Sequence, residues 1–290
     1  AFGNQRWQHK PEFREGQVHD LRGERSAFYL AKTLRTPVSQ KVKFSFGSDD
    51  GARLFLNGQE ILRRDVQRSA AADQDIVDLE LAKAAGDTSK RLYDRNRAVY
   101  ALLRYGVKVK PEVGEQTVTV WLIDWRDPHA NDFALAEEVT VKAADPKAYD
   151  KRPDAVIYVN GIALGVLELK RSTVSVSQGI RQNLDNQKPN FIEPFFSTLQ
   201  LLMAGNDSEG LRYGTIAKYY LRWKEDAATD DGLAPAAPWS ALENPLDREL
   251  AQLCAKARFL ELIHDFIVFD AGIKKLCRHN QYFGVRAAQA

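Results

Sequence analysis

The sequence predicts an α/β protein in which a mixed sheet is flanked by helices, with a small β-sandwich-like module before it and a helical segment after it. Three observations support this organisation. Residues 1–86 read as short strands separated by turn residues, and residues 87–225 combine apolar strands with two helices. Residues 245–290 have helical periodicity, and the Ala- and Pro-rich residues 226–244 are expected to be a linker.

The composition is that of a globular protein. Among 290 residues, 44% are hydrophobic, which excludes a disordered or collagen-like chain. Lys and Arg number 41 against 39 Asp and Glu, so the net charge does not identify a nucleic-acid binder. The two cysteines, Cys254 and Cys277, lack zinc-ligand spacing and indicate a reducing compartment. We therefore expect a soluble cytoplasmic protein with no membrane partner.

Alternation of apolar and polar residues predicts the strands of the first module. It is clearest in Lys41–Phe46, where every second residue is apolar. Turn residues follow at Gly47–Gly51 and at Asn57-Gly58. The other expected strands of this module are Ser26–Leu34, Arg53–Leu56 and Ile76–Leu81.

The pattern changes to a helix from about Gly86 to Gly106, which marks a domain boundary. A second helix is expected over Val176–Asn186, and a third opens at Asn244-Pro245, where Asn is the cap and Pro occupies the first turn. The strands expected between and beside these helices are Gln116–Asp124, Ala134–Val141, Asp154–Val159, Ile162–Lys170, Leu199–Ala204 and Gly214–Ala217.

Two carboxylates and a lysine flank one apolar hairpin. Asp154 precedes its first strand, and Glu168 and Lys170 end its second. Asp and Glu supply the hard oxygen ligands that Mg²⁺ prefers, and Lys170 shares a strand face with Glu168. An exposed strand edge is the ordinary reading of Glu-x-Lys, but strands this apolar are buried on both faces, so charges at their ends need another explanation.

The register of this hairpin decides whether the two carboxylates can meet. A two-residue turn at Asn160-Gly161 would place Asp154 opposite Leu167 and Glu168 on the other face. A three-residue loop, or a bulge in the hairpin, would place Asp154 opposite Glu168. A shared metal site therefore predicts the longer loop or the bulge.

The helix that follows offers polar groups for a phosphate backbone. Gln178, Gln182 and Asn186 are spaced by four residues and lie on one helix face, where their amides could donate to phosphate oxygens. Arg171 and Arg181 are candidates for the same role. A solvated helix face remains the alternative interpretation of this pattern.

A resemblance gives these residues a common context. From roughly residue 88 to the end, the chain resembles the N-terminal domain of the R subunit of type I restriction enzymes, a PD-(D/E)xK nuclease. The matching segments are Arg91–Tyr105, Leu122–Trp125, Asn131–Phe133, Arg152–Lys170, Gly179–Asn190, Phe195–Tyr213 and Phe259–Ala288.

The resemblance implies roles for individual residues. Asp154, Glu168 and Lys170 would be catalytic, and Asp154 and Glu168 would hold Mg²⁺. The family carries a Gln-x-x-x-Tyr motif on the next helix; Gln182 matches its glutamine, whereas Asn186 stands where tyrosine is usual.

The resemblance also implies partners. The family acts on double-stranded DNA together with a modification (methyltransferase) subunit and a specificity subunit. An ATP-driven motor follows this domain, and Arg278–Phe283 resembles the lead-in to it. ATP would then bind only in the full-length subunit, through a motor domain absent here.

A competing hypothesis comes from the first module. Residues 1–85 resemble PA14-like β-sandwich modules of bacterial surface proteins, and Asp49 and Asp50 lie in one of its turns. The chain would then be a catalytically inert binding or scaffold module, with a β domain that binds carbohydrate or protein.

Overall fold

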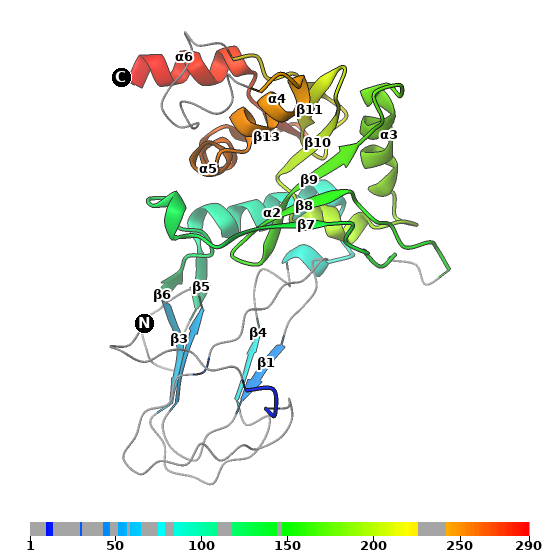
Figure 1. Ribbon diagram of the computed structural model, residues 1–290. Helices are drawn as coiled ribbons and strands as arrows, with labels where there is room; N and C mark the ends of the chain where they lie inside the picture. Colours follow the sequence, from blue (N-terminus) through cyan, green and yellow to red (C-terminus); the bar gives the residue numbers. More distant parts are fainter. Residues whose placement is uncertain are drawn as a thin grey trace.

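The computed structural model describes residues 10–13, 30, 43–46, 52–56, 59–64, 75–78, 84–109, 118–143, 147–225 and 242–289. Its centre is a six-stranded mixed sheet with the order β12-β11-β10-β9-β8-β7 (Figure 1). All neighbouring strands are antiparallel except β9 and β10, which are parallel. The strands are β7 (Phe133–Glu137), β8 (Ala155–Val159), β9 (Ile162–Leu169), β10 (Leu201–Asn206), β11 (Gly210–Gly214) and β12 (Tyr220–Leu221).

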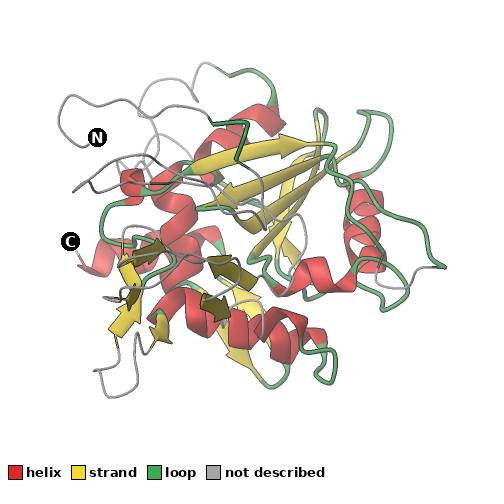
Figure 2. Cartoon of the chain, turned by 90° about the horizontal axis from the view of Figure 1, so that it is seen from below, coloured by secondary structure: helices red, strands yellow, loops and turns green. Residues whose placement is uncertain are grey.

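Helices lie on both sides of the sheet (Figure 2). On one face, side chains of four helices, one of them Tyr282 of α6 (His279–Gln289), share a core with Leu164, Leu167 and Met203 of the sheet. On the other face, Val166 and Leu202 pack with a short 3-10 helix, η2 (Glu193–Ser197). The other helices on the first face are α2 (Leu92–Tyr105), α4 (Pro245–Leu253) and α5 (Lys256–Asp265). Helix α3 (Val176–Asn186) connects β9 to β10 in the chain.

Most of the elements expected for residues 87–225 are found, with shifted ends. The expected strand Gly214–Ala217 is wrong, because β11 ends at Gly214. The Thr215 hydroxyl donates to the carbonyl of Lys274 and accepts from the amide of Ala217, so the chain turns away there. β7 likewise ends at Glu137, and Val141 makes only an isolated bridge to Lys151.

The prediction that residues 245–290 are helical throughout is wrong in the middle of this segment. After α5 the chain forms a hairpin of β13 (Ile267–Asp270) and β14 (Ile273–Leu276), and α6 (His279–Gln289) follows. Ala271 and Gly272 turn the hairpin with φ of 46° and 79°, a two-residue turn suited to the right-handed twist of strands. Ile267 continues the helical spacing of α5 but is the first residue of β13.

Three further pairs of strands lie outside the six-stranded sheet. They are β1 (Lys43–Phe46) with β4 (Asp75–Asp78), β2 (Ala52–Leu56) with β3 (Gln59–Arg64), and β5 (Val107–Val109) with β6 (Val118–Val120), all antiparallel. The expected strand Ser26–Leu34 and the turns at Gly47–Gly51 and Asn57-Gly58 lie outside the described residues, apart from Leu30. A β-sandwich in residues 1–86 stays a prediction.

Among the described residues, no helix has both the length and the apolar character needed to cross a membrane. Cys254 and Cys277 are both free thiols.

Candidate active site

The β8–β9 hairpin turns on two residues and then shifts its register. Asn160 and Gly161 have φ of 50° and 78°, so the turn is the short one that Asn-Gly favours. Val159 pairs with Ile162 and Tyr158 with Ala163, but Ile157 pairs with Gly165. Leu164 is therefore an extra residue, and a bulge interrupts β9.

The bulge changes which residues of β9 face Asp154. Beyond it Ala155 pairs with Leu167, so the next pair along the hairpin is Asp154 and Glu168. A strand alternates its faces, and the extra residue moves Glu168 and Lys170 to the face that Asp154 uses. The predicted bulge is confirmed, although the loop is the short one.

Four side chains meet at this end of the hairpin. Asp154 Oδ2 accepts a hydrogen bond from the amide of Leu169 at 2.6 Å. The Lys170 ammonium donates to Glu168 Oε1 at 2.7 Å and to Gln182 Oε1 at 2.9 Å. Glu168 is 2% exposed. The hairpin and α3 together thus assemble two carboxylates, an ammonium group and an amide.

The Glu168 carboxyl is a strongly perturbed acid. Its pKa is raised from 4.5 to about 7, chiefly by burial. The hydrogen bond from Lys170 acts against this rise, whereas the negative charge of Asp154 and a hydrogen bond with it add to the rise. Two carboxylates within hydrogen-bonding reach are stable only when a proton or a cation lies between them.

The unsatisfied oxygen of Glu168 is consistent with a divalent cation. Glu168 Oε2 is buried, and no described group donates a hydrogen bond to it. Buried oxygens without partners are rare, and a hard cation would bind both this atom and the Asp154 carboxylate. Asp154 and Glu168 therefore fit the donor set expected for Mg²⁺, although the described residues contain no cluster of three or more metal-binding side chains.

The raised pKa predicts how pH acts on the metal-free protein. The folded chain keeps a proton on Glu168 up to about pH 7, whereas the unfolded chain releases it near 4.5, so the free energy of unfolding falls as pH rises through this window. Glu168→Gln, which is neutral at every pH, is expected to raise the thermal midpoint at pH 8 by about 5 °C and to leave it unchanged near pH 4.

Glu138→Gln is the matched control for this measurement, because Glu138 is exposed and pairs with Arg152 at 3.3 Å. An equal shift of the midpoint at both pH values for Glu168→Gln would contradict the assignment of the raised pKa to Glu168.

Helix α3 lies close to the carboxylates because a glycine faces them. A Cβ atom at Gly179 would lie 3.1 Å from the Cβ of Ala204 and 3.6 Å from Cγ of Glu168. Asn183 fixes the next turn of the helix by donating to the carbonyl of Met203 at 2.9 Å. The close approach brings Gln182 within reach of Lys170.

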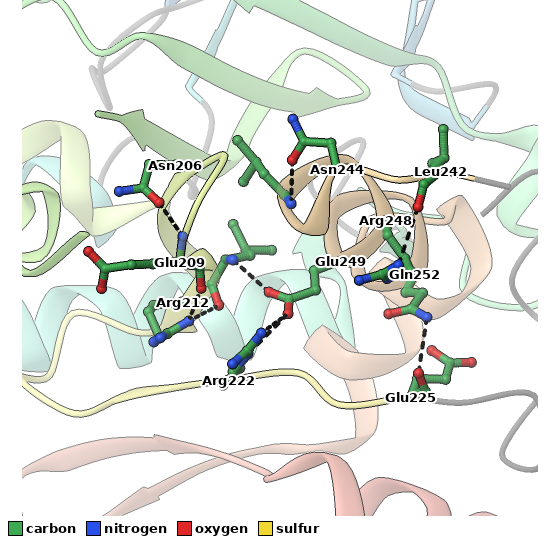
Figure 3. A network of polar contacts seen from close by, with 12 residues as sticks. Asn206, Glu209, Arg212, Arg222, Glu225, Leu242, Asn244, Arg248, Glu249 and Gln252 are labelled. Carbon is green, nitrogen blue, oxygen red and sulfur yellow. Dashed lines mark hydrogen bonds and ion pairs between the residues drawn. The ribbon is translucent and has the colours of Figure 1, made fainter. Parts of the chain in front are cut away.

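The turn between β10 and β11, residues 206–210, makes hydrogen bonds to the segment that joins Lys170 to α3. Asn206 donates to the carbonyl of Val174, and Glu209 accepts from the amide of Val176 at the start of α3. On its other side Glu249 of α4 accepts from the amide of Leu211 at 2.6 Å (Figure 3). One turn therefore holds both the segment after Lys170 and helix α4.

A cavity of about 670 Å³ opens beside the carboxylates along α3. Gln178, Gln182 and Asn186 all line it, as their spacing predicts for one helix face, and Arg181 lines it as well. Asn186 is 4% exposed, whereas Gln178, Arg181 and Gln182 are exposed, so most of this helix face is solvated, as the alternative interpretation expects. Arg171 is exposed and is not among the described residues that line this cavity.

Sequence reasoning missed the opposite side of the cavity, which Lys151 and Phe191 form. The Lys151 ammonium lies 4.1 Å from the centre of the Phe191 ring. These residues are 40 positions apart and belong to no spacing pattern, so no signal in the sequence joins them.

Comparisons with known proteins identify a family. Residues 34–220 match a family described as type I restriction enzyme R protein N terminus. The match begins well before residue 88 and so includes much of the segment that sequence analysis assigned to a separate module.

Two curated relatives are similar over much of the chain. The endonuclease subunit of the type I restriction enzyme HindI of Haemophilus influenzae is 26% identical over 257 residues, 85% of this chain and 23% of the relative. A putative endonuclease subunit of the type I restriction enzyme MjaIXP of Methanocaldococcus jannaschii is 27% identical over 209 residues, 67% of this chain and 20% of the relative. The chain thus spans about a quarter or less of the length of these relatives.

Proposed function

This chain belongs to the type I restriction enzyme R protein N-terminus family, and from that premise we propose that residues 87–225 form a PD-(D/E)xK nuclease domain. The domain hydrolyses phosphodiester bonds of duplex DNA with the help of Mg²⁺. Asp154 and Glu168 are the metal ligands, and Asp154, Glu168 and Lys170 are the catalytic residues. Gln178, Gln182, Arg171 and Arg181 contact or position the DNA.

The observation that carries this proposal is the convergence of Asp154, Glu168 and Lys170 around a buried carboxylate oxygen without a donor. Each unsatisfied buried polar group costs about 1–3 kcal/mol. Atoms of Arg95 and Tyr220 are also buried without a hydrogen-bond partner among the described residues, but Glu168 Oε2 is the carboxylate oxygen of this set and lies beside a second carboxylate and an ammonium group. Here the lysine satisfies one oxygen of Glu168, and no described group donates a hydrogen bond to the other.

Bound Mg²⁺ would supply charge stabilisation at the scissile phosphate and acidify a bound water. The chain's own groups prepare this chemistry. The Leu169 amide fixes the Asp154 carboxylate through Oδ2, and burial orients Glu168. Lys170 has its ammonium between Glu168 and Gln182, where it can orient the attacking water or neutralise the phosphate.

The partners and the ATP requirement are part of the same proposal. Two relatives are named as endonuclease subunits of type I restriction enzymes. We infer that this chain acts within such a complex, where a specificity subunit recognises the DNA site and a modification subunit methylates it. ATP would act through a motor elsewhere in the full-length subunit.

If the chain were an inert binding or scaffold module, the two carboxylates would be expected to lie apart. A scaffold has no reason to hold two of them in mutual contact, and the contact of Asp154 with Glu168 supports the nuclease proposal instead. Carbohydrate or protein binding by residues 1–86 stays a prediction.

Asp154→Asn tests the proposal at its metal ligand. In the complex of the full-length subunit with its partner subunits, this variant is expected to lose DNA cleavage by at least about a hundredfold. Calorimetric titration of the chain with Mg²⁺ is expected to show binding to the wild type and none to the variant.

Asp150→Asn is the matched control, since Asp150 is an exposed aspartate near the hairpin that pairs with Lys142 at 2.7 Å. The nuclease proposal fails if Asp154→Asn binds Mg²⁺ and cuts DNA as the wild type does.

A further inference from the structure

The cavity along α3 is connected to the carboxylate site through one residue. Gln182 lines the cavity and also accepts a hydrogen bond from Lys170 at 2.9 Å. Its volume is about 670 Å³, and it is open to solvent rather than enclosed. An occupant of the cavity would therefore lie against Gln182, the side chain that accepts from Lys170.

The charges around the cavity favour an anion. Three cationic side chains line it, Lys151, Arg181 and Lys188, against one carboxylate, Asp185. Asp185 is already paired with Lys188 at 2.6 Å. No described carboxylate forms an ion pair with Lys151 or Arg181. Two positive charges and several amide groups are thus left to face the cavity.

Lys151 is held in place by the structure around it. Its backbone makes two hydrogen bonds with Val141, at 2.8 and 3.0 Å. Its ammonium lies over the Phe191 ring at 4.1 Å, and the amide of Phe191 is anchored to the carbonyl of Lys188. A cation over an aromatic face is attracted by the ring electrons, so Lys151 does not sample the many rotamers of a free lysine.

The same contact distinguishes a phosphate from a base as the occupant. A base would stack on the face of Phe191, as aromatic platforms bind single strands. Lys151 lies over one face of this ring. The exposed chemistry is instead ammonium, guanidinium and amide donors, which contact phosphate oxygens.

We propose that this cavity is a subsite for the sugar–phosphate backbone next to the scissile phosphate, in which Lys151 and Arg181 bind a flanking phosphate and Phe191 supports Lys151. The inference rests on the proposed nuclease function, in which Arg181 already contacts DNA, and extends it to Lys151 and Phe191, which no sequence motif marks. The contact is to the backbone, so it is independent of base sequence.

Binding of a DNA duplex to the 290-residue chain tests the subsite. With a fluorescein-labelled duplex of about 30 base pairs, roughly three helical turns, Lys151→Ala is expected to weaken binding roughly threefold to tenfold. The slope of log affinity against log salt is expected to fall by about one, as one phosphate contact is lost. Lys151→Arg is expected to restore both, and Phe191→Leu to give an intermediate loss.

Lys256→Ala is the matched control. Lys256 is exposed and lies over the ring of Phe133 at 5.2 Å, so it is the same kind of pair outside the cavity, and its loss should change neither the affinity nor the slope. A second duplex of unrelated sequence is expected to show the same loss for Lys151→Ala.

The outcomes separate this inference from the proposed function. In the assembled complex Lys151→Ala is expected to raise KM for DNA and to leave kcat unchanged, whereas Asp154→Asn loses cleavage and retains DNA binding. The subsite is overturned if Lys151→Ala keeps the wild-type affinity and salt slope, or if its loss depends on the base sequence. Either result leaves the metal site at Asp154 and Glu168 to be decided by Asp154→Asn.

Discussion

Replacement of Lys170 by methionine is expected to lower Mg²⁺-dependent DNA cleavage by the assembled complex by about a hundred- to ten-thousandfold. Methionine keeps the length of the side chain but removes the ammonium that contacts Glu168 and Gln182. The positive charge near the scissile phosphate is lost with it. The pKa of Glu168 should rise further, since the hydrogen bond from Lys170 lowers it.

Single-turnover cleavage at two pH values measures both effects. Raising the pH is expected to restore the ionised state of Glu168 but not the cleavage rate, because the ammonium itself is missing. Lys142→Met is the control, as Lys142 is an exposed lysine paired with Asp150 outside the site. Cleavage by Lys170→Met that recovers fully at higher pH would show that Lys170 serves only to ionise Glu168.

The largest effect on stability is expected from Arg258. Its guanidinium is fully buried and makes two hydrogen bonds to Glu225, at 2.6 and 3.1 Å, and one to the carbonyl of Gln252 at 2.9 Å. It also lies within 6 Å of the rings of Trp223, Tyr282 and Phe283. Arg258→Met leaves the buried Glu225 unpaired and is expected to cost about 3–5 kcal/mol of unfolding free energy.

Thermal unfolding is expected to show a fall in midpoint of about 10 °C for Arg258→Met. The double variant Arg258→Met with Glu225→Leu is expected to recover much of this loss, because it removes both charges together. Arg286→Met is the control, since its pair with Glu261 is partly exposed and is worth at most about 1 kcal/mol. Equal destabilisation by the single and double variants would contradict a dominant role for the unpaired charge.

The sequence contains enough information to locate the candidate site. Apolar strands bounded by Asp154 and Lys170 stand out because charges at the ends of doubly buried strands are rare. The spacing of Gln178, Gln182 and Asn186 places them on one face of α3, and the structure places all three on the wall of one cavity. Local periodicity therefore predicts both the hairpin and the helix that flanks it.

What the sequence does not contain is the geometry set by tertiary packing. Asn160-Gly161 favours a short turn, and nothing local shows that a bulge forms at Leu164, three residues after Gly161. Ile267 continues the helical spacing of α5, yet the chain leaves the helix there and pairs with β14. The cation–π contact of Lys151 with Phe191 depends on the path of the loop after α3. No rule of residue spacing predicts that path.

Because of the bulge at Leu164, the number of residues between the turn and Glu168 decides whether Glu168 shares a face of the hairpin with Asp154. Side chains alternate along a strand, so one residue removed between the turn and Glu168 would exchange the faces and separate Glu168 from Asp154. One residue added to each strand would lengthen the hairpin and keep the pair on the same face. The hairpin can therefore change in length only where Asp154 and Glu168 stay on the same face. Single-residue insertions and deletions here are for this reason more damaging than many substitutions.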